Sequence, residues 1–260
     1  MPVLRFNAKS FKEAVKTVFW AVFVAVIFRS FFFQPFSIPS GSMKPTLLIG
    51  DFLFVSKYAY GWSQYSFPFS FPKFNGRLMG KQPERGDVVV FKLPTDTGKD
   101  YVKRLIGLPG DKVQIVRGHL FVNGKMLPYE TKEAFVENNI PQGKEKRLPK
   151  CVNEPAPLGG ACIKYQFRES FPSGKSYNVL NSDDNFGGAD NTGEYLVPEG
   201  YYFFMGDNRD NSTDSRYTRH VGMVAYKNLI GRAELIFLSS EGRAFAFWKW
   251  RLSRFLKIIE

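Results

Sequence analysis

Ser42 and the groups that could activate it are the residues of this chain whose types suggest chemistry. Ser42 lies in residues 36–46, FSIPSGSMKPT, shortly after the one apolar stretch long enough to cross a membrane. A serine hydroxyl is a weak nucleophile and needs a base within hydrogen-bond reach. The sequence therefore suggests nucleophilic catalysis, provided that the fold supplies such a base.

Three side chains are candidates for that base. His220 lies in a basic segment, where a lone histidine is usually just solvated. Lys44 is close in sequence, but on an extended strand it would stand parallel to Ser42 rather than bend over its oxygen. Lys103 lies in an apolar run, and burial could lower its pKa from about 10.4 to about 8 at a cost of about 3 kcal/mol. The pattern alone nevertheless favours an ordinary exposed strand lysine at position 103.

A third polar segment, residues 206–216 (GDNRDNSTDSR), alternates carboxylates and guanidiniums. It suits a network of charge-assisted hydrogen bonds, as would any surface turn held by ion pairs. A calcium loop starting at Asp210 is excluded, because its sixth position is Ser215 rather than Gly and its twelfth is Val221 rather than Glu. With only two histidines and two cysteines, no Cys/His metal site is expected, and we predict no cofactor.

The elements that must position these groups begin with an apolar segment at residues 17–36. Twenty residues of helix span about 30 Å of hydrocarbon, and Arg29 near the far end can snorkel to the interface. Arg5, Lys9, Lys12 and Lys16 precede the segment. The positive-inside rule then places residues 1–16 in the cytoplasm and everything after the anchor outside.

Two other interpretations of this segment are weaker. A cleavable signal peptide would need an A-x-A-like site, and none follows. A buried core helix would show a polar face, which is nearly absent here. We therefore expect an uncleaved transmembrane anchor.

The rest of the chain predicts a mainly β protein with an antiparallel catalytic core. Short apolar runs at residues 51–55, 87–91, 112–116, 201–205 and 233–238 are punctuated by Gly, Pro and Asp. Asn123-Gly124 is typical of a type I′ hairpin turn. We expect the core in two parts, residues 37–124 and 201–246, separated by a β-rich insertion or small β-domain at residues 125–200.

Several features leave alternatives open. The aromatic residues of segment 58–74 could pack a loop or lie at lipid headgroup level. The basic aromatic tail, residues 247–260, could lie on anionic lipid or form a solvated terminal helix. Cys151 and Cys162 could pair or remain free thiols. The formal charge of +12 has no nucleic-acid-binding motif beside it, so no nucleic-acid partner is predicted.

Four segments together resemble bacterial type I signal peptidase (leader peptidase), a membrane-anchored serine protease with a Ser–Lys dyad. The matching segments, in the family's order behind an anchor, are residues 39–46 (PSGSMKPT), 85–91 (RGDVVVF), 101–111 (YVKRLIGLPGD) and 206–216. Residues 125–200 match only as the family's variable insertion. Family members from Gram-negative bacteria often carry two membrane spans, whereas one is expected here, and Lys44 replaces a commonly uncharged residue.

This resemblance implies a role for each matching residue. Ser42 would be the nucleophile and Lys103 the general base, and the Ser40 hydroxyl would stabilise the oxyanion together with the Ser42 backbone N–H. Ser212 would hold the lysine amine, with Asp207, Asp214 and Arg216 supporting the loop.

The resemblance also implies the substrate, a preprotein emerging from the secretion machinery and cut after small residues in an Ala-x-Ala-like pattern. The extended substrate would pair with a β-edge and place two small side chains in shallow pockets. The pocket residues would be Phe36, Ile38, Met43, Leu47, Val90, Tyr101 and Val102. The enzyme would sit in the bacterial plasma (inner) membrane with its catalytic domain on the outer, periplasmic face.

Two rivals remain. A self-cleaving repressor-type Ser–Lys protease would carry a DNA-binding front end where this chain has an anchor. A catalytically idle, membrane-tethered β-module would bind lipid or peptide through its aromatic and basic surfaces.

Overall fold

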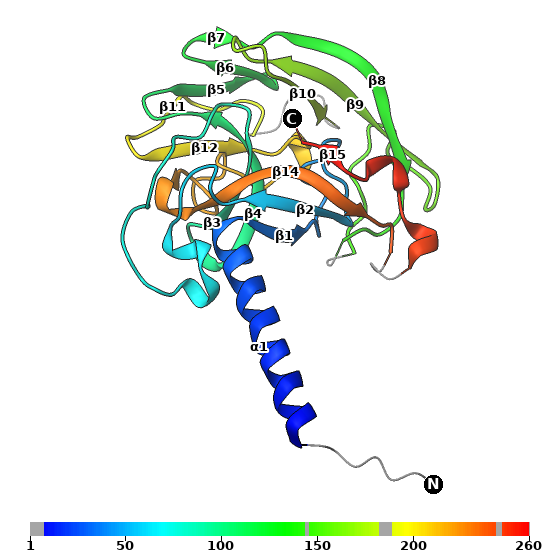
Figure 1. Ribbon diagram of the computed structural model, residues 1–260. Helices are drawn as coiled ribbons and strands as arrows, with labels where there is room; N and C mark the ends of the chain where they lie inside the picture. Colours follow the sequence, from blue (N-terminus) through cyan, green and yellow to red (C-terminus); the bar gives the residue numbers. More distant parts are fainter. Residues whose placement is uncertain (1–7, 144–145, 182–188, 243–245, 260) are drawn as a thin grey trace.

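A computed structural model describes residues 8–143, 146–181, 189–242 and 246–259. One long helix, α1 (Ala8–Phe31), projects from a β-rich body (Figure 1). The mainly β, antiparallel fold predicted from the sequence is therefore confirmed. Of the basic residues expected before the anchor, Arg5 lies outside the described residues, while Lys12 and Lys16 lie within α1 itself.

The end of α1 differs from the predicted span of residues 17–36. The helix starts earlier and stops at Phe31, and β1 (Phe33–Ser37) follows after one residue. Pro35 disfavours helix at the residue before it, and β1 gains a hydrogen-bonded partner in β2 (Asp51–Ser56). Pro35 is tolerated because β1 is the edge strand of its sheet.

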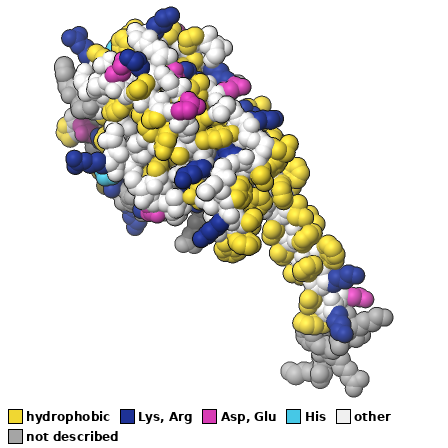
Figure 2. Space-filling view, turned by 90° about the vertical axis from the view of Figure 1, so that its left-hand side faces the viewer, with side chains coloured by type: hydrophobic (Ala, Val, Ile, Leu, Met, Phe, Trp, Pro, Cys, Tyr) yellow, Lys and Arg dark blue, Asp and Glu magenta, His cyan; other side chains and the backbone are white. Residues whose placement is uncertain are grey.

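The apolar part of α1, Phe11–Phe31, is long enough to cross a membrane, and only 6% of it is buried. A buried core helix is therefore excluded. Figure 2 shows hydrophobic side chains along the helix and on the adjoining surface of the body, with charged side chains near the other end of the helix.

The largest sheet positions the site. Its hydrogen-bonded order is β1, β2, β14 (Leu229–Ser239), β3 (Val88–Leu93), β4 (Asp96–Gly107), β12 (Tyr201–Met205) and β13 (Val224–Ala225), with β15 (Lys257–Ile258) paired to β14. Val88 and Val90 pack into the apolar cluster on one face, and Val89 and Phe91 into the cluster on the other. Because both faces of β3 are covered by apolar clusters, residues 88–91 form a continuous apolar run in the sequence.

Two smaller sheets complete the body. One contains β11 (Tyr195–Leu196), β5 (Lys112–Val116), β6 (His119–Val122) and β7 (Lys125–Met126), and the other contains β10 (Ser176–Asn181), β9 (Ala161–Ser170) and β8 (Tyr129–Asn138). Asn123 and Gly124 both have positive φ, 53° and 73°, as the predicted I′ turn requires.

The predicted insertion is smaller and more integrated than residues 125–200 suggested. β7 pairs with β6, and β11 pairs with β5, so both ends of the range belong to the sheet of the core. Its own sheet, β8–β10, packs through Phe171, Tyr177 and Val179 against core residues such as Phe203. Cys151 and Cys162 form a disulfide within it.

The C-terminal tail is not a helix, which corrects one of its two expected forms. It consists of two 3-10 turns, η5 (Phe247–Lys249) and η6 (Leu252–Arg254), followed by β15. Arg254 pairs with Asp51 at 2.5 Å and donates to the Thr46 carbonyl at 2.9 Å. The tail is therefore bound to the sheet beside the segment that carries Ser42. The remaining 3-10 turns are η1 (Gln64–Ser66), η2 (Pro68–Ser70), η3 (Arg209–Asn211) and η4 (Tyr226–Asn228).

Candidate active site

The structure brings together the serine and one of its three candidate bases. Lys103 Nζ lies 2.6 Å from Ser42 Oγ and donates a hydrogen bond to the Val102 carbonyl at 3.1 Å. Both side chains belong to buried residues, Ser42 at 8% and Lys103 at 4% exposure. A buried amine in contact with a hydroxyl is the geometry that proton abstraction needs.

The position of Lys103 in β4 explains its burial. The first half of this strand is exposed, whereas from Lys103 onward every residue is buried. Lys103 lies opposite Val89 of β3, and its Nζ lies 5.3 Å from the centre of the Tyr101 ring. Burial lowers the pKa of Lys103 to about 8, against the opposing charges of Asp214 and Asp207.

The loop that carries Ser42, between β1 and β2, is held by Asn208. The Asn208 backbone N–H donates to the Ser42 carbonyl at 3.0 Å, and its side-chain amide donates to the Gly41 carbonyl at 2.9 Å. Ser40 is exposed, with its Oγ 3.5 Å from Ser42 Oγ. Ser40 is therefore close enough to act on a substrate atom bonded to Ser42.

The second loop of the site, residues 206–216, is closed by a buried ion pair. Arg216 binds Asp214 through Nε at 2.9 Å and Nη2 at 3.0 Å, and the Gly206 N–H donates to the same carboxylate at 3.0 Å. Burial would raise the pKa of Asp214, but the charge of Arg216 prevails and lowers it. Asp214 and Arg216 thus form one buried ion pair within the loop.

Asp207 joins this loop to the strand that carries Lys103. Arg104 binds Asp207 with two hydrogen bonds, Nε to Oδ1 at 2.9 Å and Nη2 to Oδ2 at 2.8 Å. The Thr46 hydroxyl donates to the same carboxylate at 2.6 Å. Asp207 therefore contacts both the serine loop and the lysine strand.

Ser212 is placed beside the pair but is not hydrogen-bonded to Lys103. Its hydroxyl is buried without a well-formed partner among the described residues. A Cβ added to Gly206 would lie 2.2 Å from Ser212 Oγ and 2.6 Å from the Ser42 carbonyl oxygen. Ser212 and Ser42 therefore flank Gly206, and only glycine fits between them.

The other two candidate bases lie elsewhere. His220 is exposed, and its backbone carbonyl accepts a hydrogen bond from Thr95. Lys44 is bound to Glu137 and donates to Gln142 Oε1 at 2.6 Å. Neither side chain is hydrogen-bonded to Ser42.

The apolar residues assigned to substrate binding are mostly gathered in one place. Six of them belong to or pack against a single cluster: Ile38, Met43, Leu47 and Val90, with Phe36 and Val102 half-buried at its margin. The seventh, Tyr101, packs against the cluster on the other face of the sheet. The cluster includes Met43, next to Ser42, so this largely buried apolar cluster adjoins the nucleophile.

Some supporting residues were not identified from the sequence. Asn208 and Arg104 lie within the matched segments, but side-chain type alone does not reveal that one holds Gly41 and the other Asp207. Glu169 binds Arg209 at 2.5 Å from the insertion. Such a partner, about 40 positions away in sequence, leaves no local signal.

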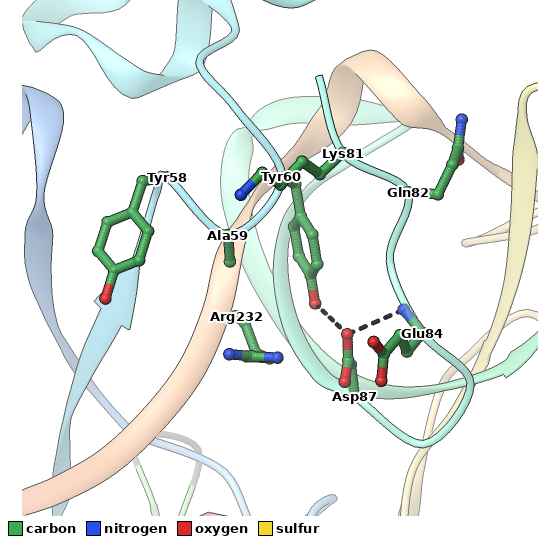
Figure 3. Close-up of a pocket in the computed structure, with 8 residues that line it drawn as sticks. All are labelled: Tyr58, Ala59, Tyr60, Lys81, Gln82, Glu84, Asp87 and Arg232. Atoms are coloured by element: carbon green, nitrogen blue, oxygen red, sulfur yellow. Dashed lines mark hydrogen bonds between the residues drawn. The ribbon is translucent and has the colours of Figure 1, made fainter. Parts of the chain in front are cut away.

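A small polar pocket of about 270 Å³ lies apart from this site (Figure 3). Tyr60 donates to Asp87 at 2.9 Å, as does the Glu84 backbone N–H at 3.0 Å. Its lining includes neither Ser42 nor Lys103. Asp87 of the segment 85–91 therefore shapes the turn before β3 rather than contacting the dyad.

Comparisons with known proteins identify the family of this chain. The family described as signal peptidase, peptidase S26, matches residues 11–238. Proteins named signal peptidase I from Rickettsia felis and Rickettsia typhi are 39% and 37% identical, each match covering 90% of this chain and 82% of the relative.

A crystal structure of a signal peptidase I from Enterococcus faecalis V583 is 28% identical. It covers 58% of this chain and 97% of that one, with a TM-score of 0.31, which is too low to bear on the fold. The family match and the relatives suffice: the chain belongs to the signal peptidase family, peptidase S26, and is a serine endopeptidase.

Proposed function

We propose that this protein removes N-terminal signal peptides from exported preproteins with a Ser42–Lys103 dyad. The observation that carries the proposal is the 2.6 Å contact between Ser42 Oγ and a buried Lys103 amine whose pKa is lowered to about 8. With that pKa about one amine in ten is neutral at pH 7, compared with about three in ten thousand at the ordinary value.

The chemistry follows from these groups. The neutral Lys103 amine takes the Ser42 proton as the hydroxyl oxygen attacks the scissile carbonyl. The Ser40 hydroxyl and the Ser42 backbone N–H donate to the oxyanion. The resulting ammonium gives its proton to the leaving amine, and water, deprotonated in turn by Lys103, hydrolyses the acyl-enzyme. Ser212, whose buried hydroxyl has no well-formed hydrogen-bond partner among the described residues, would orient the amine.

The apolar cluster next to Ser42, at whose margin Phe36 and Val102 are half-buried, supports a preference for small, apolar side chains. β1 is an edge strand, so an extended peptide can pair beside it and present alternate side chains to Phe36, Ile38 and their neighbours. This arrangement favours cleavage after Ala-x-Ala-like sequences.

The membrane part of the proposal depends on α1. We infer that Phe11–Phe31 anchors the protein in the bacterial plasma membrane, with the N-terminus in the cytoplasm and the catalytic body on the outer face. Aromatic residues of segment 58–74 contact the end of the helix: Trp62 Nε1 donates to the Phe31 carbonyl at 3.0 Å. Phe69 and Phe71 of the same segment are exposed, as suits headgroup level.

Cleavage of a peptide whose signal half ends in Ala-x-Ala tests the proposal with detergent-solubilised full-length protein. We expect activity to disappear in Ser42→Ala and in Lys103→Met and to persist in His220→Ala. Loss of activity in His220→Ala alone, or full activity in Lys103→Met, would refute the dyad. A folded wild-type protein that cleaves no such peptide would favour a tethered binding module instead.

A further inference from the structure

Lys44, two residues after the nucleophile, is held by the insertion rather than by the catalytic core. Its ammonium group binds the Glu137 carboxylate and donates to Gln142 Oε1 at 2.6 Å, and Gln142 in turn donates to Glu137 at 2.8 Å. The side chains of Lys44 and Glu137 are 6% and 11% exposed. A charged pair this buried is strongly sensitive to the removal of one partner.

The path of the Lys44 side chain links this pair to the oxyanion loop. A Cβ added to Gly41 would lie 3.2 Å from Lys44 Cε and 3.6 Å from its Nζ. The Lys44 side chain therefore lies over the peptide between Ser40 and Ser42. Whatever fixes the Lys44 ammonium also restricts this peptide.

A second contact joins the same two segments. Gly143 has φ of 68°, and a Cβ there would lie 2.6 Å from the Pro39 carbonyl oxygen. Residues 137–143 of the insertion thus approach the serine loop both at its start, near Pro39, and over Gly41. The insertion forms part of the support of the active-site loop.

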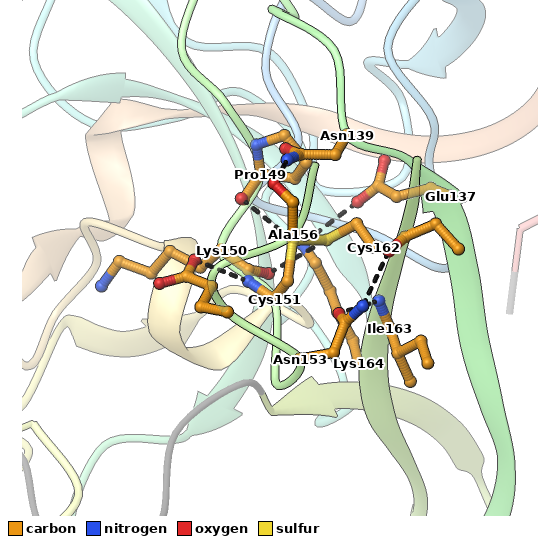
Figure 4. Close-up of a disulfide and its surroundings, with 12 residues drawn as sticks. Glu137, Asn139, Pro149, Lys150, Cys151, Asn153, Ala156, Cys162, Ile163 and Lys164 are labelled. Atoms are coloured by element: carbon orange, nitrogen blue, oxygen red, sulfur yellow. Dashed lines mark hydrogen bonds and ion pairs between the residues drawn. A yellow bond between two sulfur atoms is a disulfide. The ribbon is translucent and has the colours of Figure 1, made fainter. Parts of the chain in front are cut away.

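The acidic partner is itself anchored by the disulfide-bonded strand (Figure 4). Glu137 of β8 lies opposite Cys162 of β9, which is bonded to Cys151. Lys164, two residues along β9 and fully buried, lies with its Nζ 3.2 Å from the other Glu137 oxygen. One carboxylate thus compensates two buried ammonium groups.

Electrostatics agrees with a carboxylate that stays ionised. Burial opposes ionisation of Glu137, but the charge of Lys44 and its hydrogen bonds prevail, and the pKa of Glu137 is lowered. Burial lowers the pKa of Lys164. Without Glu137, Lys44 and Lys164 would lose the carboxylate with which both form ion pairs.

We propose that Glu137 is a positioning residue for catalysis, which acts through Lys44 to hold the Ser40–Ser42 peptide in its reactive geometry. The proposal rests on the proposed function, because it takes Ser42 as the nucleophile. It gives the insertion an indirect part in the reaction, through the loop that carries Ser42. Displacements of about 1 Å in reacting groups can cost about a hundredfold in rate.

The test is a double-mutant cycle on peptide cleavage by the full-length protein, with Lys44→Met, Glu137→Gln and the double variant. We expect Glu137→Gln to lower kcat between about tenfold and a hundredfold with KM changed less than about threefold. The double variant should be no slower than Lys44→Met alone, because Glu137 then has no lysine to position.

Glu130→Gln is the matched control, since Glu130 lies on the same strand but forms an exposed pair with Lys132. It should leave kcat unchanged. Thermal unfolding measured on each variant separates loss of folding from loss of rate. If Glu137→Gln does not fold, Gln142→Ala replaces it: that change keeps Glu137 and should lower kcat severalfold while Tm stays near the wild-type value.

Three results would overturn the proposal. The first is a kcat of Glu137→Gln equal to that of Glu130→Gln. The second is a double variant whose kcat is lower than that of Lys44→Met by the full factor that Glu137→Gln shows alone. The third is a Glu137→Gln variant with a raised KM and an unchanged kcat. Ser42→Ala is measured alongside. If Ser42→Ala retains activity, the proposed function fails. If Ser42→Ala is inactive as expected but Glu137→Gln keeps the wild-type kcat, only the positioning role of Glu137 is refuted.

Discussion

Replacing Lys103 by methionine should abolish cleavage and yet make the protein more stable. Burial lowers the pKa of Lys103 from 10.5 to about 8, so the folded protein disfavours the charged amine. Each pKa unit corresponds to 1.36 kcal/mol, which makes the cost of holding a protonated Lys103 about 3 kcal/mol. Methionine has nearly the same length, adapts to irregular space and carries no charge.

The cost has a defined pH window. Between pH 8 and 10.5 the unfolded chain binds the Lys103 proton and the folded protein does not, so stability rises with pH across this interval. Below pH 8 the full cost is present, and above pH 10.5 it is gone. Lys103→Met should therefore be more stable by about 3 kcal/mol at pH 7, with the difference shrinking as the pH approaches 10.5.

Denaturant unfolding of the full chain in detergent, at pH 7 and at pH 10, measures this difference. Lys227→Met, at an exposed lysine, is the control and should change stability by less than about 0.5 kcal/mol. A Lys103→Met variant that is less stable than wild type at pH 7, or a difference independent of pH, would refute the assignment of Lys103 as a buried, pKa-lowered amine.

Further predictions concern the pH profile and three supporting residues. The acid limb of kcat/KM should have its midpoint near pH 8, because the neutral Lys103 amine is the active form; a stopped-assay pH series checks this. Cys162→Ser opens a disulfide with a sequence separation of 11 and should lower stability by about 3 kcal/mol in denaturant unfolding. Arg104→Met leaves Asp207 buried without its partner and should cost about 3–5 kcal/mol in the same measurement. Asn208→Ala removes the hydrogen bond to the Gly41 carbonyl and should lower kcat about tenfold in the peptide assay while the protein stays folded.

The residue types that could act at this site were easier to predict from the sequence than the burial of their side chains. The serine, the lysine and the 206–216 loop were predictable because each lies in a short segment with a distinctive order of residue types. The burial of Lys103 was not predictable, because β4 changes from exposed to buried along its length. An alternating pattern does not reveal the residue at which that change occurs. A strand covered on both faces has no periodicity to detect.

Element boundaries failed where a partner distant in sequence decides them. Hydropathy predicted an anchor helix that extends to residue 36. The helix ends at Phe31, because Phe33–Ser37 pairs with β2 as a strand. The terminal helix expected as one form of the tail does not occur, and Asp51, about two hundred positions earlier, binds Arg254. Local propensity gives way to such contacts because they form only in the folded chain. Contact of the tail with anionic lipid stays a prediction.

The junction of α1 with β1 has a mechanical consequence. A single residue, Phe32, separates helix from strand, and its carbonyl accepts a hydrogen bond from the Lys57 N–H at 2.9 Å, while Trp62 binds the carbonyl just before it. These two hydrogen bonds restrict the orientation of α1 relative to β1. If α1 spans the bilayer as proposed, this restrained junction fixes the distance between the membrane surface and Ser42, and with it the position at which an emerging chain would be cut.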